Sequence, residues 1–556
     1  MVTDSDVQTT IQYHEATKHH FHRYARALGY LDWDTQPNPF RFYEGTTPLK
    51  LPFSKEEPKA LHLDLYERSR NQTHPLSLEN LSLFLELSLG LSAWKSIPGA
   101  RWPLRMNPSS GNLHPTESYV ILHTPKEYPP GVFHYNPFLH ALEPRAGFPE
   151  ELCHRFRTYF GSESFLFALT SIHWREAWKY GERAFRYSNH DLGHAIASSS
   201  FAGNLLGWKV TYLSEVTDDE LDRILGFDRI HWHDHEEEYP EVLACVHPKD
   251  QAEIPLRVPE DLLSKISALS FQGTPNRLSS DHVDWEIIPE VARSSRKSGN
   301  ASSNSIPTLD KPLLVPKEAK DLTAVQIIRQ RRSALAFDGE TSITQSQFAE
   351  ILDKTLPRKD CAPFDFGLGP VRVHLLLFVH RVTGLAPGLY MFVRDERDFE
   401  LLRSSCRPEF LWKKINDDLP LYLLGEGMLM REATAVSCHQ PIAGDSSFSL
   451  GMIAKFRPVI EEAPFLYRHL FWETGMIGQV LYLEAEAYGI RSTGIGCFFD
   501  DPTHQIMGLK DNTFQSLYHF TVGGPVEDAR LQTWPPYFHL KENMIDPSQV
   551  INFDLP

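Results

Sequence analysis

Cysteines are few in this sequence, and they form no recognisable disulfide or metal-binding pattern. The six cysteines are scattered over 556 residues, and none belongs to a Cys-x-x-Cys pair. This spacing excludes a zinc knuckle and a small domain held together by disulfides. We therefore expect reduced thiols and a cytoplasmic protein.

The chain also lacks long apolar runs and an excess of basic residues. No apolar run approaches the roughly 18 residues that cross a bilayer, and residues 1–10 lack the basic and apolar blocks of a signal peptide. The formal net charge of −17 argues against a nucleic-acid partner, since phosphate backbones attract clustered Lys and Arg. We expect a soluble protein with neither a membrane nor a nucleic acid as its partner.

Several catalytic signatures are missing as well. The sequence has no Gly-x-Gly-x-x-Gly after a strand, no phosphate-binding P-loop and no Gly-x-Ser-x-Gly elbow. The segment from His14 to His19 resembles a zinc-protease motif, but that motif needs a second histidine at position 18, where Lys18 stands. No metal site is predicted.

What the sequence does contain is an internal repeat. Its length predicts at least two domains, and the Ser- and Asn-rich residues 291–310 resemble a flexible connector. Across this connector, an offset of 282 aligns Phe185–Phe227 with Tyr467–Leu509 without a gap. Identical residues occur at Arg186/Arg468, Gly193/Gly475, Gly207/Gly489, Thr211/Thr493, Asp218/Asp500, Asp219/Asp501, Ile224/Ile506 and Gly226/Gly508.

The two copies predict the same order of elements. A helix precedes an apolar strand and a second strand, and a long helix then leads to a Gly-containing strand and a short helix. The interleaving predicts an α/β or α+β fold. Ser77 and the capping box Thr344–Gln347 mark the starts of two equivalent helices. We predict an N-terminal arm (1–60), a first domain (61–250), a linker (251–310) and a second domain (311–556).

Two polar segments are candidate ligand-binding sites. Residues 106–117 (MNPSSGNLHPTE) form a turn before a strand, and its amides and hydroxyls suit a phosphate or a ring edge, although it is equally a plain turn. Residues 329–337 (RQRRSALAF) carry three arginines whose guanidinium groups suit a phosphate. The alternative is a solvated basic helix face.

Two further segments suggest redox or acid–base chemistry. In residues 489–501 (GIRSTGIGCFFDD), Gly494 and Gly496 allow close approach of a flat ring or of a neighbouring strand. The first copy has Tyr212 and Ser214 at these positions. Lys179 and Tyr180 suit a general base and acid in a half-buried pocket, and otherwise they are an ordinary amphipathic pair.

Taken together, these motifs resemble a known family. YHEATKHH, PSSGNLHPTE, KYGERAFRYSNHDLGHA, RRSALAF, STGIGCFFDD and FTVGGP are similar to segments of the nitroreductase superfamily. Within it, the chain resembles the SagB-type (McbC-like, ThcOx-like) FMN-dependent dehydrogenases over most of residues 10–535. The resemblance implies an α+β fold of two tandem nitroreductase-like domains that form an intramolecular pseudo-dimer, so that a monomer is the complete unit.

The resemblance also implies where FMN binds. Ordinary members are homodimers with FMN at the interface, contacted by an Arg-Arg-Ser run and a glycine strand of one subunit and by a Pro-Ser-Ser-x-Asn turn of the other. Only one of the two pseudo-symmetric sites keeps all these parts here. The implied FMN-binding residues are Ser109, Ser110 and Asn112 from the first copy and Arg331, Arg332, Ser333, Gly494, Gly496, Cys497 and Arg530 from the second.

The catalytic pair implied by the resemblance is Lys179 and Tyr180, because azoline-oxidising members use a Lys-Tyr pair in this context. Lys179 would take a proton, Tyr180 would orient or protonate the substrate, and hydride would pass to the flavin. Leu335 departs from the pattern, since many nitroreductases have a cation there. The substrate would be a small molecule or modified peptide, with NAD(P)H or oxygen as redox partner. An NAD(P)H-dependent nitro or quinone reductase and a non-catalytic binding scaffold are the alternatives.

Overall fold

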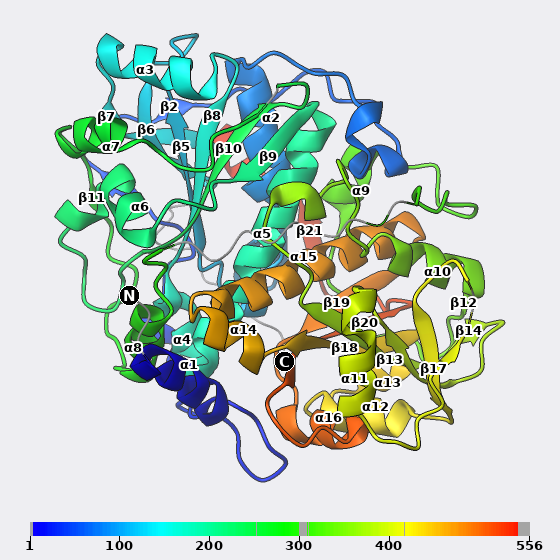
Figure 1. Cartoon of the computed structure of the whole chain (residues 1–556). Coiled ribbons are helices and arrows are strands. Elements are labelled where there is room, and N and C mark those ends of the chain that lie inside the picture. The colour runs from blue at the N-terminus through cyan, green and yellow to red at the C-terminus, as the bar shows by residue number, and fades with distance from the viewer. Residues whose placement is uncertain (1–3, 252, 300–308, 310, 416, 543–556) are drawn as a thin grey trace.

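The computed structural model describes residues 4–251, 253–299, 309, 311–415 and 417–542 (Figure 1). The N-terminal arm and the first half contain helices α1 (Asp4–Ala16), α2 (Leu78–Leu89), α3 (Glu150–Phe160), α4 (His173–Tyr180), α5 (Ala184–Leu205) and α6 (Asp218–Leu225). Their strands are β1 (Tyr43–Glu44), β2 (Leu49–Lys50), β3 (Leu91–Ile97), β4 (Ala100–Arg105), β5 (Thr116–Leu122), β6 (Gly131–Asn136), β7 (Ala141–Gly147), β8 (Phe165–Ser171), β9 (Trp208–Tyr212) and β10 (Tyr239–Pro248).

Three elements lie between the halves, namely α7 (Glu260–Ser267), β11 (Thr274–Pro275) and α8 (Ile287–Ser294). The second half contains helices α9 (Ala324–Gln330), α10 (Gln345–Asp353), α11 (Phe399–Ser405), α12 (Met430–Val436), α13 (Pro441–Asp445), α14 (Arg457–Glu462), α15 (Leu466–Ala487), α16 (Asp500–Met507) and α17 (Phe538–Glu542). Its strands are β12 (Ile343–Thr344), β13 (Val373–Val379), β14 (Val382–Thr383), β15 (Gly388–Phe392), β16 (Lys413–Lys414), β17 (Leu421–Glu426), β18 (Phe448–Lys455), β19 (Arg491–Ile495), β20 (Phe514–Gly523) and β21 (Gln532–Trp534).

The strand order confirms the internal repeat. The first half forms a seven-stranded sheet in the order β2-β7-β6-β5-β8-β10-β9, and the second forms one in the order β16-β17-β15-β13-β18-β20-β19. The equivalent strands β9 and β19 lie at the edges of their sheets and pair antiparallel with β10 and β20. Only β19 contains a glycine, because Gly207 of the first copy precedes β9. The α+β class is thus confirmed, with one seven-stranded sheet in each half (Figure 1).

The expected helix starts are also confirmed. The Ser77 hydroxyl accepts a hydrogen bond from the Asn80 amide at the start of α2. At α10, the Thr344 side chain accepts from the Gln347 amide while the Gln347 side chain accepts from the Thr344 amide. Each cap satisfies amides that the first helical turn leaves unpaired.

The long helices α5 and α15 cross at the centre of the molecule (Figure 1). At the crossing, a Cβ added to Gly193 would lie 2.3 Å from the Trp472 carbonyl oxygen, and one added to Gly475 would lie 2.2 Å from the His190 carbonyl oxygen. Only glycine allows the two backbones to come this close. The repeat therefore carries a glycine at the same place in both copies.

Two buried ion pairs, equivalent to each other in the repeat, join the halves beside this crossing. Arg186 of α5 contacts Asp500 at 2.8 Å, and Arg468 of α15 contacts Asp218 at 2.7 Å. Each arginine and its aspartate come from opposite halves, and all four side chains are almost fully buried. Three of the eight repeat identities, Arg186/Arg468, Gly193/Gly475 and Asp218/Asp500, are therefore contacts between the halves.

A terminal segment from each end of the chain packs on the other half. Helix α1, in the N-terminal arm, packs against α8 and α14, and His14 on it lies 3.3 Å from the Tyr467 hydroxyl. In the other direction, β21 pairs with β3 of the first half, and Tyr537 packs among Phe40 and Trp94. Residues 532–540 therefore pack on the first half. The predicted domain boundaries themselves stay a prediction.

The expectation of a flexible connector at 291–310 is wrong for its first residues. Helix α8 continues through Ser294, and Val291 is fully buried because α8 packs on α1. The Ser-rich composition concealed a short apolar helix face. Residues 300–308 and 310 of this connector lie outside the described residues.

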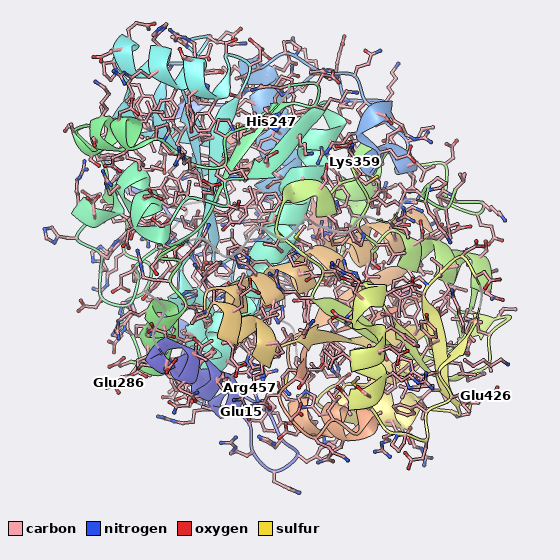
Figure 2. The ribbon with its side chains drawn as sticks, in the orientation of Figure 1. Glu15, His247, Glu286, Lys359, Glu426 and Arg457 are labelled. Atoms are coloured by element: carbon pink, nitrogen blue, oxygen red, sulfur yellow. The ribbon has the colours of Figure 1, made fainter. Side chains whose placement is uncertain are left out.

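The charged side chains of Glu286, Lys359 and Glu426 are exposed on the surface, Glu286 and Glu426 at opposite edges of the molecule (Figure 2). Within the described part of the chain, no helix combines the length and apolarity needed to cross a bilayer.

The helix crossing gives a test of the fold. Gly193→Ala should lower the free energy of unfolding by about 1–3 kcal/mol, because the new methyl group meets backbone that cannot move aside. Gly203→Ala is the matched control on the same helix. Its Cβ would lie 3.0 Å from the Val210 side chain and not against backbone, and alanine favours helix by about 1 kcal/mol, so this variant should lose less stability than Gly193→Ala. Urea unfolding midpoints measure both. Equal midpoints for the two variants would contradict the close crossing.

Candidate functional site

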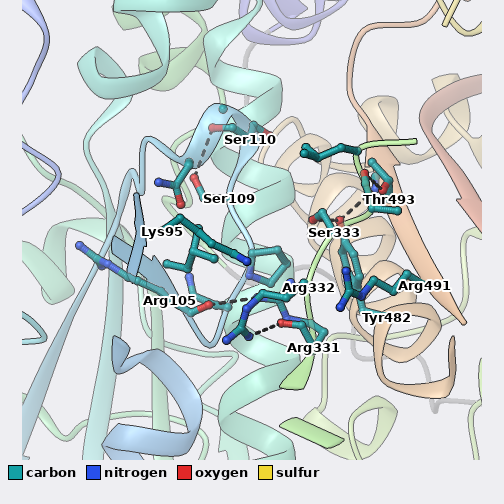
Figure 3. A pocket seen from close by; sticks show the side chains of 18 of the residues that line it. Lys95, Arg105, Ser109, Ser110, Arg331, Arg332, Ser333, Tyr482, Arg491 and Thr493 are labelled. Atoms are coloured by element: carbon teal, nitrogen blue, oxygen red, sulfur yellow. Dashed lines mark hydrogen bonds between the residues drawn. The ribbon is translucent and has the colours of Figure 1, made fainter. Parts of the chain in front are cut away.

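A cavity of about 310 Å³ lies between the two halves (Figure 3). Ser109 and Ser110 of the first half face Ser333 and Thr493 of the second across it, with Arg331 and Arg332 at one end. Its size is at the lower end of the range of small-molecule sites. Seven of the residues predicted to bind a cofactor line it: Ser109, Ser110, Asn112, Arg331, Arg332, Ser333 and Gly494.

The first wall is the turn Ser109–Asn112, and a buried carboxylate of α5 holds it. Asp191 accepts hydrogen bonds from the Ser110 amide at 3.0 Å and from the Ser110 hydroxyl at 3.1 Å. Gly111 and Asn112 both have positive φ, of 57° and 56°. The Asn112 side-chain oxygen Oδ1 is 2.8 Å from His114 Nε2. The turn is therefore anchored by its own half.

The second wall begins where α9 ends. Its last turn is followed by Arg331, and the backbone at Ser333 then bridges in parallel to Ser492 of β19. The Ser333 hydroxyl lies 2.8 Å from the Tyr482 hydroxyl, which also accepts a hydrogen bond from the Gly494 amide at 3.0 Å. Tyr482 of α15 thus ties the Arg-Arg-Ser segment to the glycine strand.

Gly494 has a local structural reason to be glycine. A Cβ at this position would lie 2.0 Å from the Tyr518 hydroxyl on β20. Any side chain here would displace Tyr518 and fill part of the cavity. The close approach of a neighbouring strand, one of the two expected explanations, is thus present.

The cavity has an excess of buried positive charge. Arg331 is 4% exposed and Arg105 is 3% exposed, and neither forms an ion pair with any described carboxylate. Burial lowers the pKa of Arg331. It lowers the pKa of Arg332 to about 10, and the neighbouring Arg331 adds to the effect. Uncompensated buried cations are costly, and a bound anion would remove that cost.

Arg331 is also incompletely hydrogen-bonded. Its Nη2 donates to the Arg105 carbonyl at 3.0 Å, and its guanidinium group covers the Tyr482 ring at 5.2 Å from the centroid. Its Nε is buried without a partner among the described residues. The alternative of a solvated basic helix face is therefore wrong for Arg331. Arg329 instead pairs with Glu57 and Glu86.

Five predicted site residues lie outside the cavity lining. Lys179 and Tyr180 end α4 directly behind the turn, where a Cβ at Gly111 would lie 2.7 Å from the Tyr180 hydroxyl and 3.3 Å from Lys179 Cδ. The Tyr180 ring packs on Tyr187 at 4.5 Å. The others are Gly496 and Cys497, which follow β19, and Arg530, whose side chain is 77% exposed and pairs with Asp528.

Gly496 and the Lys-Tyr pair are nonetheless neighbours. A Cβ at Gly496 would lie 2.0 Å from the ring of Tyr187, and that same ring contacts Tyr180. These residues form a second cluster beside the cavity. Their roles in cofactor binding and catalysis stay predictions.

Sequence reasoning missed several residues that line the cavity. Arg105 directly precedes the MNPSSGN segment, and Asp191 lies within the quoted YSNHDLGHA motif, so both had a local signal. His194 and Arg491 also line the cavity, and they lie within the quoted YSNHDLGHA and GIRSTGIGCFFDD segments. No motif pointed to Lys95, Tyr482 and Tyr518, which reach the cavity from separate elements.

The pseudo-symmetric counterpart of this cavity is filled by the protein itself. Tyr212, equivalent to Gly494, stacks on Phe366 with ring centroids 5.6 Å apart and meets Trp472 edge-on. Beside them, Arg68 forms a buried ion pair with Asp365, whose Oδ1 accepts from Nη2 at 2.8 Å. Arg331 has no ion-pair partner among the described residues in the cavity, whereas Arg68 is paired with Asp365 in the pseudo-symmetric location.

Asp191 makes the stability of the site depend on pH. Burial raises its pKa to about 7, and the hydrogen bonds from Ser109 and Ser110 only partly oppose this. Because the folded state holds the proton more tightly, Asp191 favours folding at low pH, and this contribution is lost as pH rises towards 7.

Comparison with Asp191→Asn isolates this effect. Between pH 4 and pH 8, the free energy of unfolding of the natural protein should fall relative to that of the variant by on the order of 2–4 kcal/mol. Urea unfolding at several pH values measures the difference. Asp528→Asn, at a partly exposed cavity residue whose pKa is lowered by its hydrogen bonds from Arg530, is the control and should show no such fall. A pH-independent difference for Asp191→Asn would refute the raised pKa.

The comparisons with known proteins agree with this geometry. The family model described as "Nitroreductase family" matches residues 72–234 and 328–524, one region in each half. No curated protein matches the sequence significantly.

Among solved structures, a putative nitroreductase from Anabaena variabilis has 21% sequence identity and a TM-score of 0.66, covering 93% of this chain and 99% of its own. A putative nitroreductase from Ralstonia eutropha has 15% identity and a TM-score of 0.28, over 41% of this chain and 99% of its own. The microcin synthetase McbBCD complex of E. coli contains a chain with 19% identity and a TM-score of 0.25, over 45% of this chain and 96% of its own.

The first of these structures shares the fold of both halves in one chain. Nitroreductases are oxidoreductases that typically bind a flavin. Because the family model matches well over half of the chain, in both copies of the repeat, this protein belongs to the nitroreductase family.

Proposed function

We propose that this protein is an FMN-dependent dehydrogenase of the SagB type with one flavin site, at the junction of its two halves. The observation that carries the proposal is the cavity itself, which joins the Ser109–Asn112 turn of one half to the Arg331–Ser333 segment of the other. Buried arginines without counter-ions fit the phosphate of FMN. Bound FMN would supply the acceptor for two electrons from the substrate.

The chain offers distinct groups for the two ends of such a cofactor. We assign Arg331, Arg332 and Ser333 to the phosphate, because guanidinium groups and hydroxyls donate well to phosphate oxygens. We assign the turn and Gly494 to the ring, since Gly494 leaves space that a side chain would fill. Leu335 lines the cavity without a charge, and Lys95 in the same lining supplies a cation in its place.

The Lys-Tyr pair is our candidate for proton transfer. Lys179 and Tyr180 lie behind Gly111, so only the turn separates them from the cavity. In this proposal Lys179 takes a proton from the substrate, and Tyr180 orients or protonates it. An azoline in a small molecule or modified peptide is the substrate class, because its oxidation to an azole removes one proton and one hydride.

The number of flavins tests the single site. Purified protein should contain one FMN per chain, since ring stacking and the Arg68–Asp365 pair fill the second location. Arg331→Ala should weaken FMN binding by about 10- to 100-fold, as expected for a lost hydrogen bond to a charged group. Arg329→Ala, two residues away and paired with glutamates, should bind FMN normally. Fluorescence titration of apoprotein measures this, and two FMN per chain or none would refute the proposal.

Turnover tests the catalytic pair. Lys179→Ala should slow oxidation of a thiazoline-containing peptide by about 10²- to 10⁴-fold while FMN stays bound, as expected for loss of a general base. Lys413→Ala, at an exposed lysine of β16, is the control. Thiazole absorbance and flavin content are the readouts. Undiminished turnover in Lys179→Ala would remove the pair from the mechanism. Flavin reduction by NADPH without peptide oxidation would favour a nitro or quinone reductase.

A further inference from the structure

Two cysteines far apart in sequence meet beside the glycine strand. Cys438 follows α12, and Cys497 follows β19, yet their Sγ atoms are 2.7 Å apart. Both residues are partly exposed and both are free thiols. Of the other four cysteines, all of which lie in the described part of the chain, three are buried and none pairs with a second sulfur.

The spacing of the two sulfurs is close to that of a bond. A disulfide has an S–S distance of about 2.05 Å, so closure needs a movement of less than about 1 Å. Cys438 Sγ and Cys497 Sγ already share a hydrogen bond. Cys438, with φ of 53°, and His439, with φ of 60°, are consecutive left-handed residues in this loop. Such backbone costs free energy and is concentrated at functional sites.

The surroundings favour a thiolate on Cys497. The hydrogen bond shared with Cys438 lowers the pKa of Cys497, and the Arg183 guanidinium lowers it further, while burial and Asp500 oppose. Arg183 is held in place, because its Nη2 donates to the Gly496 carbonyl at 3.2 Å and its Nη1 pairs with Asp500 at 3.0 Å. The thiolate is the nucleophile of thiol–disulfide exchange.

The pair is also accessible. The aromatic rings of Phe21 and Tyr24, from the N-terminal arm, pack on Phe499 and are 45% and 50% exposed. Burial raises the pKa of Tyr24, and Cys438 and Cys497 add to the effect. Cys438 and Cys497 are themselves partly exposed, and we expect a small oxidant to approach them from this side.

We propose that Cys438 and Cys497 form a redox-active dithiol that small-molecule disulfides oxidise reversibly to an intramolecular disulfide. The Cys497 thiolate attacks one sulfur of the oxidant and releases the other as a thiolate, giving a mixed disulfide. Cys438 then loses its proton and attacks Cys497 Sγ, which releases the second thiol. The protein gives up two electrons and its two thiol protons, and the oxidant is reduced to two thiols.

The disulfide would link two elements next to the candidate site. Cys497 directly follows Gly496, which packs tightly against the Tyr187 ring, and the Cys497 carbonyl accepts from Gln440 at 3.1 Å. Oxidation would fix the end of β19 to the loop at 437–440. This inference depends on the cysteines alone, so it holds or fails independently of bound FMN.

Thiol trapping in glutathione buffers tests the proposal. Full-length protein is equilibrated with oxidised and reduced glutathione at several ratios and then alkylated with N-ethylmaleimide. As oxidised glutathione increases, two alkylated thiols per chain should be lost, and peptide mass spectrometry should find Cys438 linked to Cys497. Excess dithiothreitol should restore both thiols. Cys361→Ser, which removes another partly exposed cysteine, should leave this behaviour unchanged.

Single variants separate the two roles. Cys438→Ser should stop at the mixed disulfide and carry one glutathione on Cys497. Cys497→Ser should carry at most one-tenth as much glutathione, on Cys438. Urea midpoints close to that of the natural protein establish that the variants fold. If Cys497 forms the adduct in Cys438→Ser but the natural protein forms no internal disulfide, the proposal is wrong. It is equally wrong if glutathione modifies Cys361 as readily as Cys497.

Discussion

The structure depends on how closely α5 and α15 approach each other. Gly193 and Gly475 bring the two backbones into contact, and the ion pairs Arg186–Asp500 and Arg468–Asp218 fix the helices from both sides. Because these pairs are buried, removing one partner would leave a charge without compensation. The crossing sets the distance between the halves, and the cavity between the Ser109–Asn112 turn and the Arg331–Ser333 segment exists only at that distance.

One chain that contains both halves of a pseudo-dimer is free to change them separately. A homodimer must repeat every substitution at both of its sites. Here β9 has Tyr212 where β19 has Gly494. The Tyr212 ring stacks on Phe366 and so fills the pseudo-symmetric counterpart of the cavity. In the same way Asp365 neutralises Arg68, whereas Arg331 keeps an open charge. The two locations have thus diverged into a packed core and a cavity.

The sequence predicted the architecture well because the repeat identities lie at positions that the backbone and the interface demand. Gly226 and Gly508 end equivalent helices in the left-handed conformation, and Thr344 caps a helix as expected. The Ser109–Asn112 turn and the Arg331–Ser333 run were recognised from their composition and do share one cavity. Helix caps, turns and local polar motifs depend on residues close together in the chain, so a single sequence predicts them.

Tertiary structure decided the rest. The sequence by itself determined two copies of an α+β unit, the caps and turns of its elements, and which copy kept which polar motif. It did not show that Tyr482 ties Ser333 to Gly494, that Asp191 holds the turn, or that Cys438 meets Cys497. Periodicity and spacing report only on neighbours along the chain, whereas these contacts join segments whose distance is set by the packing of α5 on α15.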